Sequence, residues 1–302
     1  MNDPRTTVIV ITHNRRDELL HTLDRLTALP EQPPVTVVDN ASTDHTAHAV
    51  RTHHPAVTLL TPGRNLGATG RNLAARLATT PYLAFCDDDS WWEAGSLTGA
   101  ADLLQAHPRL ATVTARILVH PTTGEEPYED PIVTELRHSP LPRPPWLTTP
   151  ALGSFLAAAT VVRTDAFRTA GGFCPRLWLG GEEELLATDL AAHGWWLTYA
   201  DDLTAHHRPS PHRDTRLRRR HGIRNTLWST WLRRSAPAAL ARTAHLARTV
   251  PRDATSARAF AEAAAGIGWI LRERRPVPRP VERRLRLLDT CQKTSTARRY
   301  VG

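Results

Sequence analysis

The sequence predicts an α/β fold in which a doubly wound parallel sheet is followed by a C-terminal helical extension. Short β-branched apolar runs alternate with amphipathic helical segments along the first half of the chain, which is typical of such a sheet. Up to His212 the chain has 16 arginines and 24 acidic residues, a net charge of −8. Residues 213–302 have 22 basic and 6 acidic residues, a net charge of +16. We therefore expect two segments, 1–212 and 213–302.

The first strand is expected at Val8–Ile11, because four β-branched residues follow one another there. A helix should come next, since Asn14 can cap it and leucines recur at helical spacing over residues 19–26. Pro33 and Pro34 would end this helix. The second strand is then expected at Val35–Val38.

The third strand is expected at Val57–Leu60 and the fourth at Tyr82–Phe85. Between them, a loop with two glycines opens an alanine- and leucine-rich helix that reaches Ala78. The proline-rich stretch 121–150 is expected to be an irregular excursion over the site, and the chain after residue 213 should be helical. Other expected elements are a buried strand or helix segment at 151–162, a helix at 182–193 and a strand at 195–200.

Several classes of protein are excluded by composition. The three cysteines are far apart, so they form neither a disulfide framework nor a paired metal motif. The longest nearly apolar run, residues 151–162, is well short of the ~20 residues that span a bilayer. Because the N-terminus also lacks the pattern of a signal peptide, we expect a cytoplasmic protein.

Acidic residues follow two of the expected strands. Asp39 ends the second strand, and Asp87, Asp88 and Asp89 follow the fourth. Ligands bind at the carboxyl ends of strands in such sheets. Three adjacent carboxylates repel one another unless a cation balances them, and Mg²⁺ or Mn²⁺ prefers oxygen ligands and diphosphates. The run therefore predicts a metal–diphosphate site, and a solvated acidic turn is the alternative.

Three further motifs could carry chemistry. The glycines of the loop at residues 65–70 would let a ligand approach the backbone, with Arg71 available for a phosphate or carboxylate. The acidic run 182–184 at a helix start either interacts with the helix dipole or contains a general base. His206 and His207 are either metal ligands or surface residues.

Taken in order, these motifs resemble the family 2 glycosyltransferases, which have the GT-A fold. The resemblance extends over about 205 residues. It rests on Val10-Ile11-Thr12-His13-Asn14-Arg15, Val38-Asp39-Asn40-Ala41-Ser42, Asn65-x-Gly67-x-x-Gly70-Arg71-Asn72, Asp87-Asp88-Asp89, Gly171-Gly172-Phe173, Gly181-Glu182-Glu183 and His206-His207.

The resemblance implies a nucleotide-diphosphate sugar as the donor. The nucleotide base pocket would be at the end of the first strand, Asp39 would bind the base or ribose, and Asp88 would lie near the ribose or sugar. The glycine-bearing loop would contact the donor, and Gly171-Gly172-Phe173 would pack beneath the acceptor region. The implied donor-binding residues are Thr12, Asn14, Asp39, Asn65, Gly67, Arg71, Asp87 and Asp88.

The resemblance also implies a bound Mg²⁺ or Mn²⁺ and an inverting transfer to a hydroxyl group. Asp89 would ligate the metal, with Asp87 as a second candidate because the triple aspartate leaves two placements of the family's Asp-x-Asp motif. One of His206 and His207 would complete the shell. Glu183 would be the general base, with Glu182 as its competitor, since three glutamates stand where the family more often has Glu-Asp.

Two other functions stay open at this point. A nucleotidyltransferase acting on a sugar phosphate also uses a metal-bound aspartate cluster, and clustered arginines are typical of nucleic-acid binding. The acidic strand ends would repel nucleic acid, so none is expected as a partner. The acceptor is a glycan, a lipid-linked sugar or a small natural product. The arginine-rich segment either makes a peripheral contact with the cytoplasmic face of a membrane or packs as a helical appendage on the acidic segment.

Overall fold

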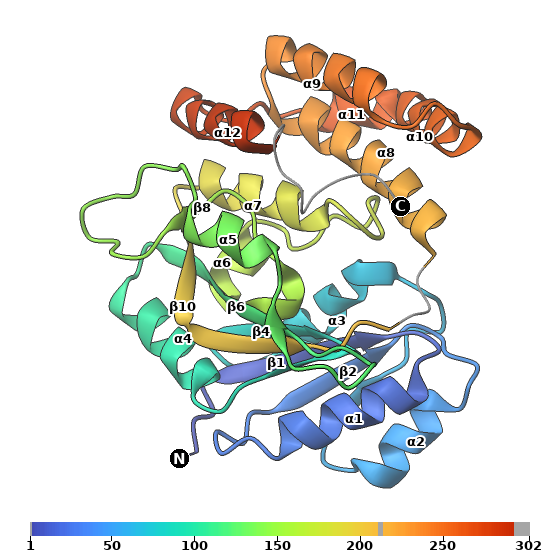
Figure 1. The fold of residues 1–302 in the computed structure, drawn as a ribbon, viewed down its shortest axis with the longest axis vertical. Helices are drawn as coiled ribbons and strands as arrows, with labels where there is room; N and C mark the ends of the chain where they lie inside the picture. The colour runs from blue at the N-terminus through green and yellow to red at the C-terminus, as the bar shows by residue number, and fades with distance from the viewer. Residues whose placement is uncertain (1, 211–213, 293–302) are drawn as a thin grey trace.

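The computed structural model describes residues 2–210 and 214–292. Figure 1 shows one twisted sheet with helices on both of its faces, and a layer of C-terminal helices stacked beyond α7. The expected boundary between residues 212 and 213 lies outside the described residues. The predicted fold class, an α/β sheet with a C-terminal helical extension, is confirmed.

The first part of the chain alternates strands and helices in the expected order. Strands β3, β2, β1 and β4 are neighbours in that order and are all parallel, as predicted. The elements are β1 (Thr6–Thr12), α1 (Arg16–Thr27), β2 (Val35–Asp39), α2 (Thr46–His53), β3 (Thr58–Leu60), the 3₁₀ turn η1 (Gly67–Gly70), α3 (Arg71–Leu77), β4 (Tyr82–Asp87), β5 (Ser90–Trp92) and α4 (Ser96–Ala106).

Beyond β4 the sheet is mixed. Strand β9 runs antiparallel between β4 and β6, β10 runs parallel to β6, and β5 pairs antiparallel with β10 at the edge. The segment 151–162 is not one element, because it divides into two strands and a 3₁₀ turn. The elements are β6 (Leu110–Val119), β7 (Tyr128–Glu129), α5 (Ile132–Arg137), β8 (Ala151–Leu152), η2 (Ala157–Ala159), β9 (Thr160–Arg163), α6 (Thr164–Thr169), α7 (Glu182–Ala192) and β10 (Trp196–His207).

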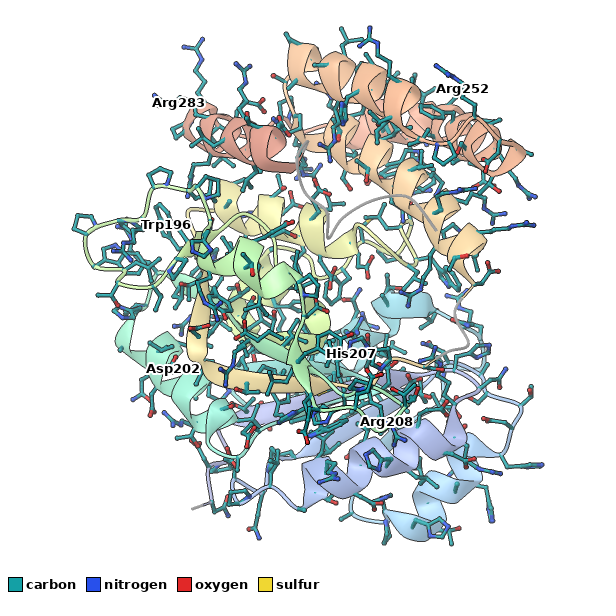
Figure 2. All side chains as sticks on the ribbon, in the orientation of Figure 1. Trp196, Asp202, His207, Arg208, Arg252 and Arg283 are labelled. Atoms are coloured by element: carbon teal, nitrogen blue, oxygen red, sulfur yellow. The ribbon has the colours of Figure 1, made fainter. Side chains whose placement is uncertain are left out.

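The C-terminal segment is helical as predicted, with breaks near the prolines. Its exposed arginines include Arg252 and Arg283, whose side chains point outward in Figure 2. Among the described residues, no helix combines the length and the apolar character needed to cross a bilayer. The helices are α8 (Thr215–Arg233), α9 (Ala236–Thr249), α10 (Ala254–Ala265), α11 (Ile267–Glu273) and α12 (Arg279–Gln292).

The start of α1 differs from the expectation. Asn14 does not cap this helix, because its φ of +53° turns the backbone and its Oδ1 accepts the Thr43 N–H at 2.7 Å. The Arg16 N–H instead donates to Asp44 Oδ2 at 3.0 Å. These bonds join the loop after β1 to the loop after β2, so the two strand ends form one surface.

An aromatic cluster fixes the Gly171-Gly172-Phe173 segment. The Phe173 ring is fully buried and lies 5.4 Å from Phe85 and 5.3 Å from Phe167, measured between centroids. Asn72 of α3 holds the same residue by its backbone, donating from Nδ2 to the Phe173 oxygen at 2.7 Å and accepting its N–H at 3.0 Å. This cluster joins the β4 strand to the chain that leads to α7.

We predict that Phe173→Ala lowers the free energy of unfolding by about 3–5 kcal/mol, because a fully buried ring is lost and leaves a cavity. Leu77→Ala is the control, since Leu77 is 63% exposed and its loss should change stability by less than about 0.5 kcal/mol. Urea unfolding followed by tryptophan fluorescence measures both. Equal destabilisation by the two changes would contradict the central place of Phe173 in the core.

Candidate functional site

Polar residues meet where the parallel strands end. Thr12 of β1 is in register with Asp39 of β2, and Ile11 is in register with Asp87 of β4. Thr12 and Asp39 are buried, whereas the Asp87 side chain is 40% exposed. The carboxyl ends of parallel strands are the usual ligand-binding edge of such a sheet. The structure therefore brings the strand-end candidates to one edge.

The glycine-bearing loop is held on this edge by Asn40. Asn40 Oδ1 accepts the Leu66 N–H and its Nδ2 donates to the Gly67 oxygen, both at 3.1 Å. Asn65 Oδ1 accepts the Gly67 N–H at 2.8 Å and shapes the turn. Asn40 was given no role from sequence, although it follows Asp39 at the strand end. Its amide can serve both bonds because Asn carries a donor and an acceptor.

Gly67 is required by its position. Its φ is +59°, and a Cβ there would lie 2.3 Å from the Trp178 oxygen. Ala68 N–H donates to the same oxygen at 2.8 Å, and Trp178 Nε1 donates to the Asn65 oxygen at 3.2 Å. The loop is thus in direct backbone contact with residues 177–181, which precede α7.

The buried Arg71 forms an ion pair with the partly exposed Asp87. Arg71 begins α3 and is 3% exposed, and its Nη2 contacts Asp87 Oδ1. The guanidinium carbon also lies 5.9 Å from the Phe85 ring centroid and 6.0 Å from that of Phe173. The arginine predicted to bind the donor is therefore already balanced by an aspartate of the acidic run.

Arg15 balances the other two aspartates. Its Nη1 is 3.0 Å from Asp88 Oδ1 and 3.1 Å from Asp89 Oδ2. Burial raises the pKa of Asp88 to about 7, with Asp89 and Asp87 adding to the rise and Arg15 opposing it. Arg15 had no role in the sequence interpretation, although it stands in the first motif. Its position directly before α1 was the available signal.

The two histidines of β10 lie apart. His207 Nε2 is 3.6 Å from Asp89 Oδ1, so this histidine joins the acidic run. His206 Nε2 is 2.8 Å from Glu93 Oε2 and its Nδ1 is 2.8 Å from His120 Nε2. Because neighbouring strand residues point to opposite faces, only His207 can reach Asp89.

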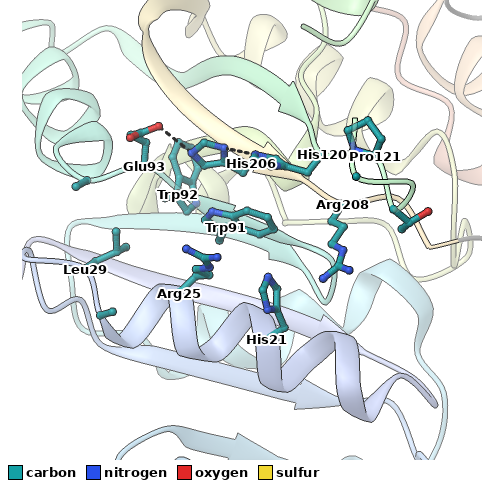
Figure 3. Close-up of a pocket in the computed structure, with 14 residues that line it drawn as sticks. His21, Arg25, Leu29, Trp91, Trp92, Glu93, His120, Pro121, His206 and Arg208 are labelled. Carbon is teal, nitrogen blue, oxygen red and sulfur yellow. Dashed lines mark hydrogen bonds and ion pairs between the residues drawn. The ribbon is translucent and has the colours of Figure 1, made fainter. Parts of the chain in front are cut away.

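Figure 3 shows where His206 lies instead. It stacks on Trp91, with ring centroids 5.2 Å apart, in a cavity of about 600 Å³ that Arg25 also lines. Burial lowers the pKa of His206, and its ion pair with Glu93 opposes that shift. Of the two histidines left open by the sequence, the structure therefore brings His207, and not His206, to the acidic run.

The two candidate bases at the start of α7 differ in their surroundings. Glu182 is 4% exposed and its Oε2 has no hydrogen-bond partner among the described residues. Burial raises the pKa of Glu182, and the Glu183 carboxylate raises it further, while Arg71 opposes the shift. Glu183 is only partly buried, and its Oε1 accepts the Ala157 N–H. Glu182 is therefore the buried member of the pair, in which burial favours the protonated form, and Glu183 is the anchored, more accessible one.

A divalent cation would find few protein ligands here. Among residues 2–210 and 214–292, no three His, Cys, Asp or Glu side chains are gathered closely enough to hold a metal ion. Asp89 Oδ1 and His207 Nε2 are close enough for both to contact one ion at about 2.1 Å each. Ions such as Mg²⁺ are commonly held by one or two side chains together with substrate phosphates, so this pair fits that kind of site.

Two relatives are similar in sequence. An N-acetylglucosaminyl-diphospho-decaprenol L-rhamnosyltransferase of Mycobacterium tuberculosis is 28% identical over 224 residues, which cover 64% of this chain and 72% of the relative. A validoxylamine A glucosyltransferase of Streptomyces hygroscopicus subsp. limoneus is 40% identical over 91 residues, covering 28% of this chain and 20% of the relative.

Solved structures agree on the fold. A mannosyltransferase from Pyrobaculum calidifontis, in complex with GDP-Man and Mn²⁺, has a TM-score of 0.60 at 23% identity, covering 97% of this chain and 81% of its own. Residues 1–349 of S. aureus TarS, in complex with UDP, have a TM-score of 0.55 at 19% identity, covering 82% of this chain and 73% of their own. The fold is the GT-A fold that the sequence motifs implied.

The profile of glycosyl transferase family 2 matches residues 7–163, which is more than half of the chain. The match begins in β1, ends with β9 and contains Asp39, the glycine-bearing loop and the triple aspartate. The chain belongs to glycosyl transferase family 2 and is a glycosyltransferase.

Proposed function

We propose that this glycosyltransferase transfers a sugar from a nucleotide-diphosphate sugar to a hydroxyl acceptor with inversion at the anomeric carbon. The main support for this proposal is the position of the candidate residues at one edge of the sheet. A single edge of the sheet gathers Asp39, the run Asp87–Asp89 and His207. Residues 177–181, which bond to the glycine-bearing loop at this edge, lead directly into α7. Donor, cation and base candidates therefore share one site.

The donor would lie across the ends of β1, β2 and β4. Asp39, whose Oδ1 is held by the Ser42 N–H at 2.9 Å, would bind the base or ribose, with Thr12 and Asn14 beside it. Asn65, Gly67 and Arg71 would contact the donor from the glycine-bearing loop, while Asp87 and Asp88 would lie nearer its ribose and sugar. Support comes from the GDP-Man and UDP complexes of the structural neighbours, which are complexes of those proteins.

We propose Asp89 and His207 as the protein ligands of a divalent cation, Mn²⁺ or Mg²⁺. Asp87 is the weaker candidate, because it pairs with Arg71 and because the His207 nitrogen lies 3.6 Å from Asp89 Oδ1. When bound, such a cation stabilises the negative charge that develops on a diphosphate leaving group. Arg15 contacts Asp88 and Asp89 and limits the repulsion between them before a cation binds.

Glu183 is the proposed general base. Its carboxylate is fixed through Oε1 by the Ala157 N–H, and it would accept the proton of the acceptor hydroxyl as that oxygen attacks the anomeric carbon. The attack comes from the face opposite the leaving group, so a single base suffices and the configuration inverts. Glu182, whose raised pKa favours its protonated form, would stand behind Glu183 without adding a second charge.

We propose a lipid-linked acceptor. The rhamnosyltransferase relative is named for a diphospho-decaprenol acceptor, which favours a lipid-linked acceptor over a free glycan or a small natural product. Exposed arginines of the helical extension could then contact the cytoplasmic face of a membrane. Family membership does not favour the nucleotidyltransferase or nucleic-acid-binding alternatives.

We expect a nucleotide that binds the donor site to raise the melting temperature only when Mn²⁺ or Mg²⁺ is present. A ligand that binds only the folded state raises the free energy of unfolding with the logarithm of its concentration relative to Kd. The rise is about 2.7 kcal/mol at a hundredfold excess. Thermal-shift assays with UDP-, dTDP- and GDP-sugars, with each metal and with EDTA, measure this. Asp89→Asn should remove the metal dependence, while Asp102→Asn, at an exposed position on α4, should not. A metal-dependent shift that persists in Asp89→Asn, or a shift of equal size with EDTA in the wild type, would refute the cation site.

We predict that Glu183→Gln lowers transfer by at least about 100-fold while the Kd for nucleotide, measured by calorimetry, changes little. The amide keeps the shape and can still contact the Ala157 backbone region, but it cannot accept the acceptor proton. Glu182→Gln, which mimics the protonated acid, should retain most activity at pH 7. Larger loss with Glu182→Gln than with Glu183→Gln would transfer the base assignment to Glu182.

The raised pKa of Glu182 gives a pH dependence of stability. Below the ordinary glutamate pKa, both the folded and unfolded states hold the proton, so the group has no effect. As pH rises, the unfolded state releases the proton first, and the folded state of the wild type loses stability. Glu182→Gln has no such proton, so its stability relative to wild type should increase from pH 5 to pH 8. Urea unfolding at both pH values, with Glu184→Gln as control, tests this, and a pH-independent difference would contradict it.

A further inference from the structure

Asn225 of α8 lies against the loop that leads into α7. Its side chain is completely buried, and its Nδ2 donates into a group of three carbonyl oxygens, those of Leu177 at 2.8 Å, Leu179 at 3.0 Å and Gly180 at 2.5 Å. Its Oδ1 accepts from Arg224 Nε at 2.9 Å, which directs the amide nitrogen toward the loop. The side-chain amide of Asn225, in the C-terminal extension, thus donates to the backbone turn that precedes α7.

The turn needs a donor at this place. Trp178, Gly180 and Gly181 all have left-handed backbone conformations, with φ of +62°, +83° and +82°, and together they direct the carbonyls inward. A Cβ on Gly181 would lie 3.2 Å from Asn225 Cβ, so the glycine allows α8 to approach. Buried carbonyls without a donor are costly, because they lose their hydrogen bonds to water. Leu177 O also accepts from Arg224 Nη2 at 3.2 Å and from the Leu179 N–H at 2.7 Å, so the carbonyls that depend most on Asn225 are those of Leu179 and Gly180.

The same loop touches both halves of the proposed site. On one side, the Trp178 oxygen and indole bond to Ala68 and Asn65 of the glycine-bearing loop. On the other side, the Gly181 oxygen accepts the Leu185 N–H at 3.1 Å in the first turn of α7, which carries Glu183. Residues 177–181 are thus the direct link between the donor loop and the proposed base.

α8 is a firm support for this link. Ile223 and Leu227 of α8 share one hydrophobic cluster with Leu177 and Leu185, so the two segments are packed together next to Asn225. Further along α8, Arg233 Nη2 is 3.0 Å from Asp189 Oδ2 of α7.

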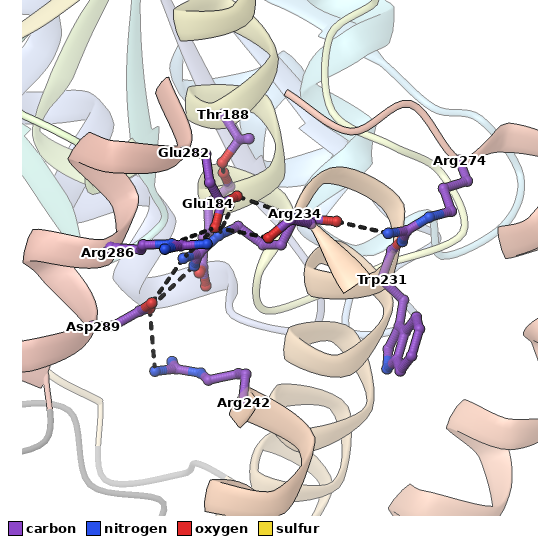
Figure 4. A network of polar contacts seen from close by, with 10 residues as sticks. Glu184, Thr188, Trp231, Arg234, Arg242, Arg274, Glu282, Arg286 and Asp289 are labelled. Atoms are coloured by element: carbon purple, nitrogen blue, oxygen red, sulfur yellow. Dashed lines mark hydrogen bonds and ion pairs between the residues drawn. The ribbon is translucent and has the colours of Figure 1, made fainter. Parts of the chain in front are cut away.

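At the end of α8 lies the network in Figure 4. The buried Arg234 contacts Glu282 Oε2 at 3.1 Å and Asp289 Oδ2 at 2.7 Å, both on α12. Arg274 donates to the Arg234 oxygen at 2.8 Å. These contacts fix the end of α8 on its neighbours in the extension, so the helix can hold the loop in one position.

We propose that Asn225 is a positioning residue for sugar transfer: by holding the carbonyls of residues 177–180, it places Glu183 relative to the donor loop. The helical extension then completes the active site. This inference rests on the proposed function of Glu183. Misplacing a reacting group by about 1 Å can lower a rate by about 100-fold, so loosening the loop should act on turnover. Donor binding should change little, since Asn40 still holds the glycine-bearing loop in place when the Ala68 bond to Trp178 loosens.

Asn225→Asp tests the proposal with almost no change of shape. When ionised, the new carboxylate can donate to neither the Leu179 nor the Gly180 carbonyl and repels both, so the loop should open at a pH where this carboxyl group is charged. We expect at least a 10-fold loss in release of nucleoside diphosphate from UDP-glucose, dTDP-glucose or GDP-mannose with Mn²⁺. Calorimetric Kd values for UDP, dTDP and GDP with Mn²⁺ should change by less than threefold. Hydrogen exchange should accelerate in peptides covering 65–72 and 177–185. Asn225→Ser keeps one donor and should give intermediate values.

Thr243→Val is the matched control. It removes the acceptor of the Trp231 Nε1 bond, 3.0 Å long, and so weakens α8 against α9 without touching the loop. It should lower the melting temperature while leaving turnover and exchange at 177–185 unchanged. Equal loss of turnover in both variants, or unchanged exchange in Asn225→Asp, would overturn the inference. If wild type releases no nucleotide from any sugar donor, the proposed function fails, and accelerated exchange confined to the two loop peptides still supports the contact made by Asn225.

Discussion

The accumulation of carboxylates at one sheet edge is the constraint to which the rest of the site responds. Three consecutive aspartates end β4, with Asp39 and Glu182 nearby, and their repulsion opposes folding unless cations balance it. Two arginines do this from separate elements. Arg15 precedes α1 and Arg71 begins α3, so each is carried by a helix that packs on the sheet. The placement of both helices is therefore part of the electrostatics of the site.

The excess of carboxylates over arginines at this edge favours the binding of a cation. Arg15 is shared between two carboxylates, so one guanidinium compensates their two charges only in part. A divalent ion beside Asp89 would complete the compensation. Stability and ligand binding are thus opposed at this edge, as expected where a functional site collects like charges.

The parallel half of the fold could be predicted from sequence because its signals are local. β-branched runs and leucines at helical spacing identify β1 to β4 and the helices between them. The mixed half could not, since β6 alternates threonines with apolar residues and pairs with strands far along the chain. The apolar segment 151–162 shows the same limit, because only its partners determine that it breaks before β9.

The candidate site also contains residues that the sequence could identify and residues that it could not. Asp39 and the triple aspartate were identified because a parallel strand end is a position that sequence can specify. The choice between His206 and His207 depends on the face that β10 presents after a register shift between Ala200 and Thr204, which no local pattern encodes. The roles of Arg15, Asn40 and Asn225 depend on partners between 26 and 74 residues away.

Acidic partners balance part of the positive charge of the extension. All of Glu262, Glu282, Asp253 and Asp289 pair with arginines of the extension, and Arg233 pairs with Asp189 of the acidic segment. Part of the excess positive charge thus holds the helices together and onto α7, while arginines such as Arg252 and Arg283 point to solvent. A segment kept only to contact an acidic surface would need no buried Asn225 directed at three carbonyls. That contact is specific in shape as well as in charge, and it explains why the extension is packed on the loop before the proposed base.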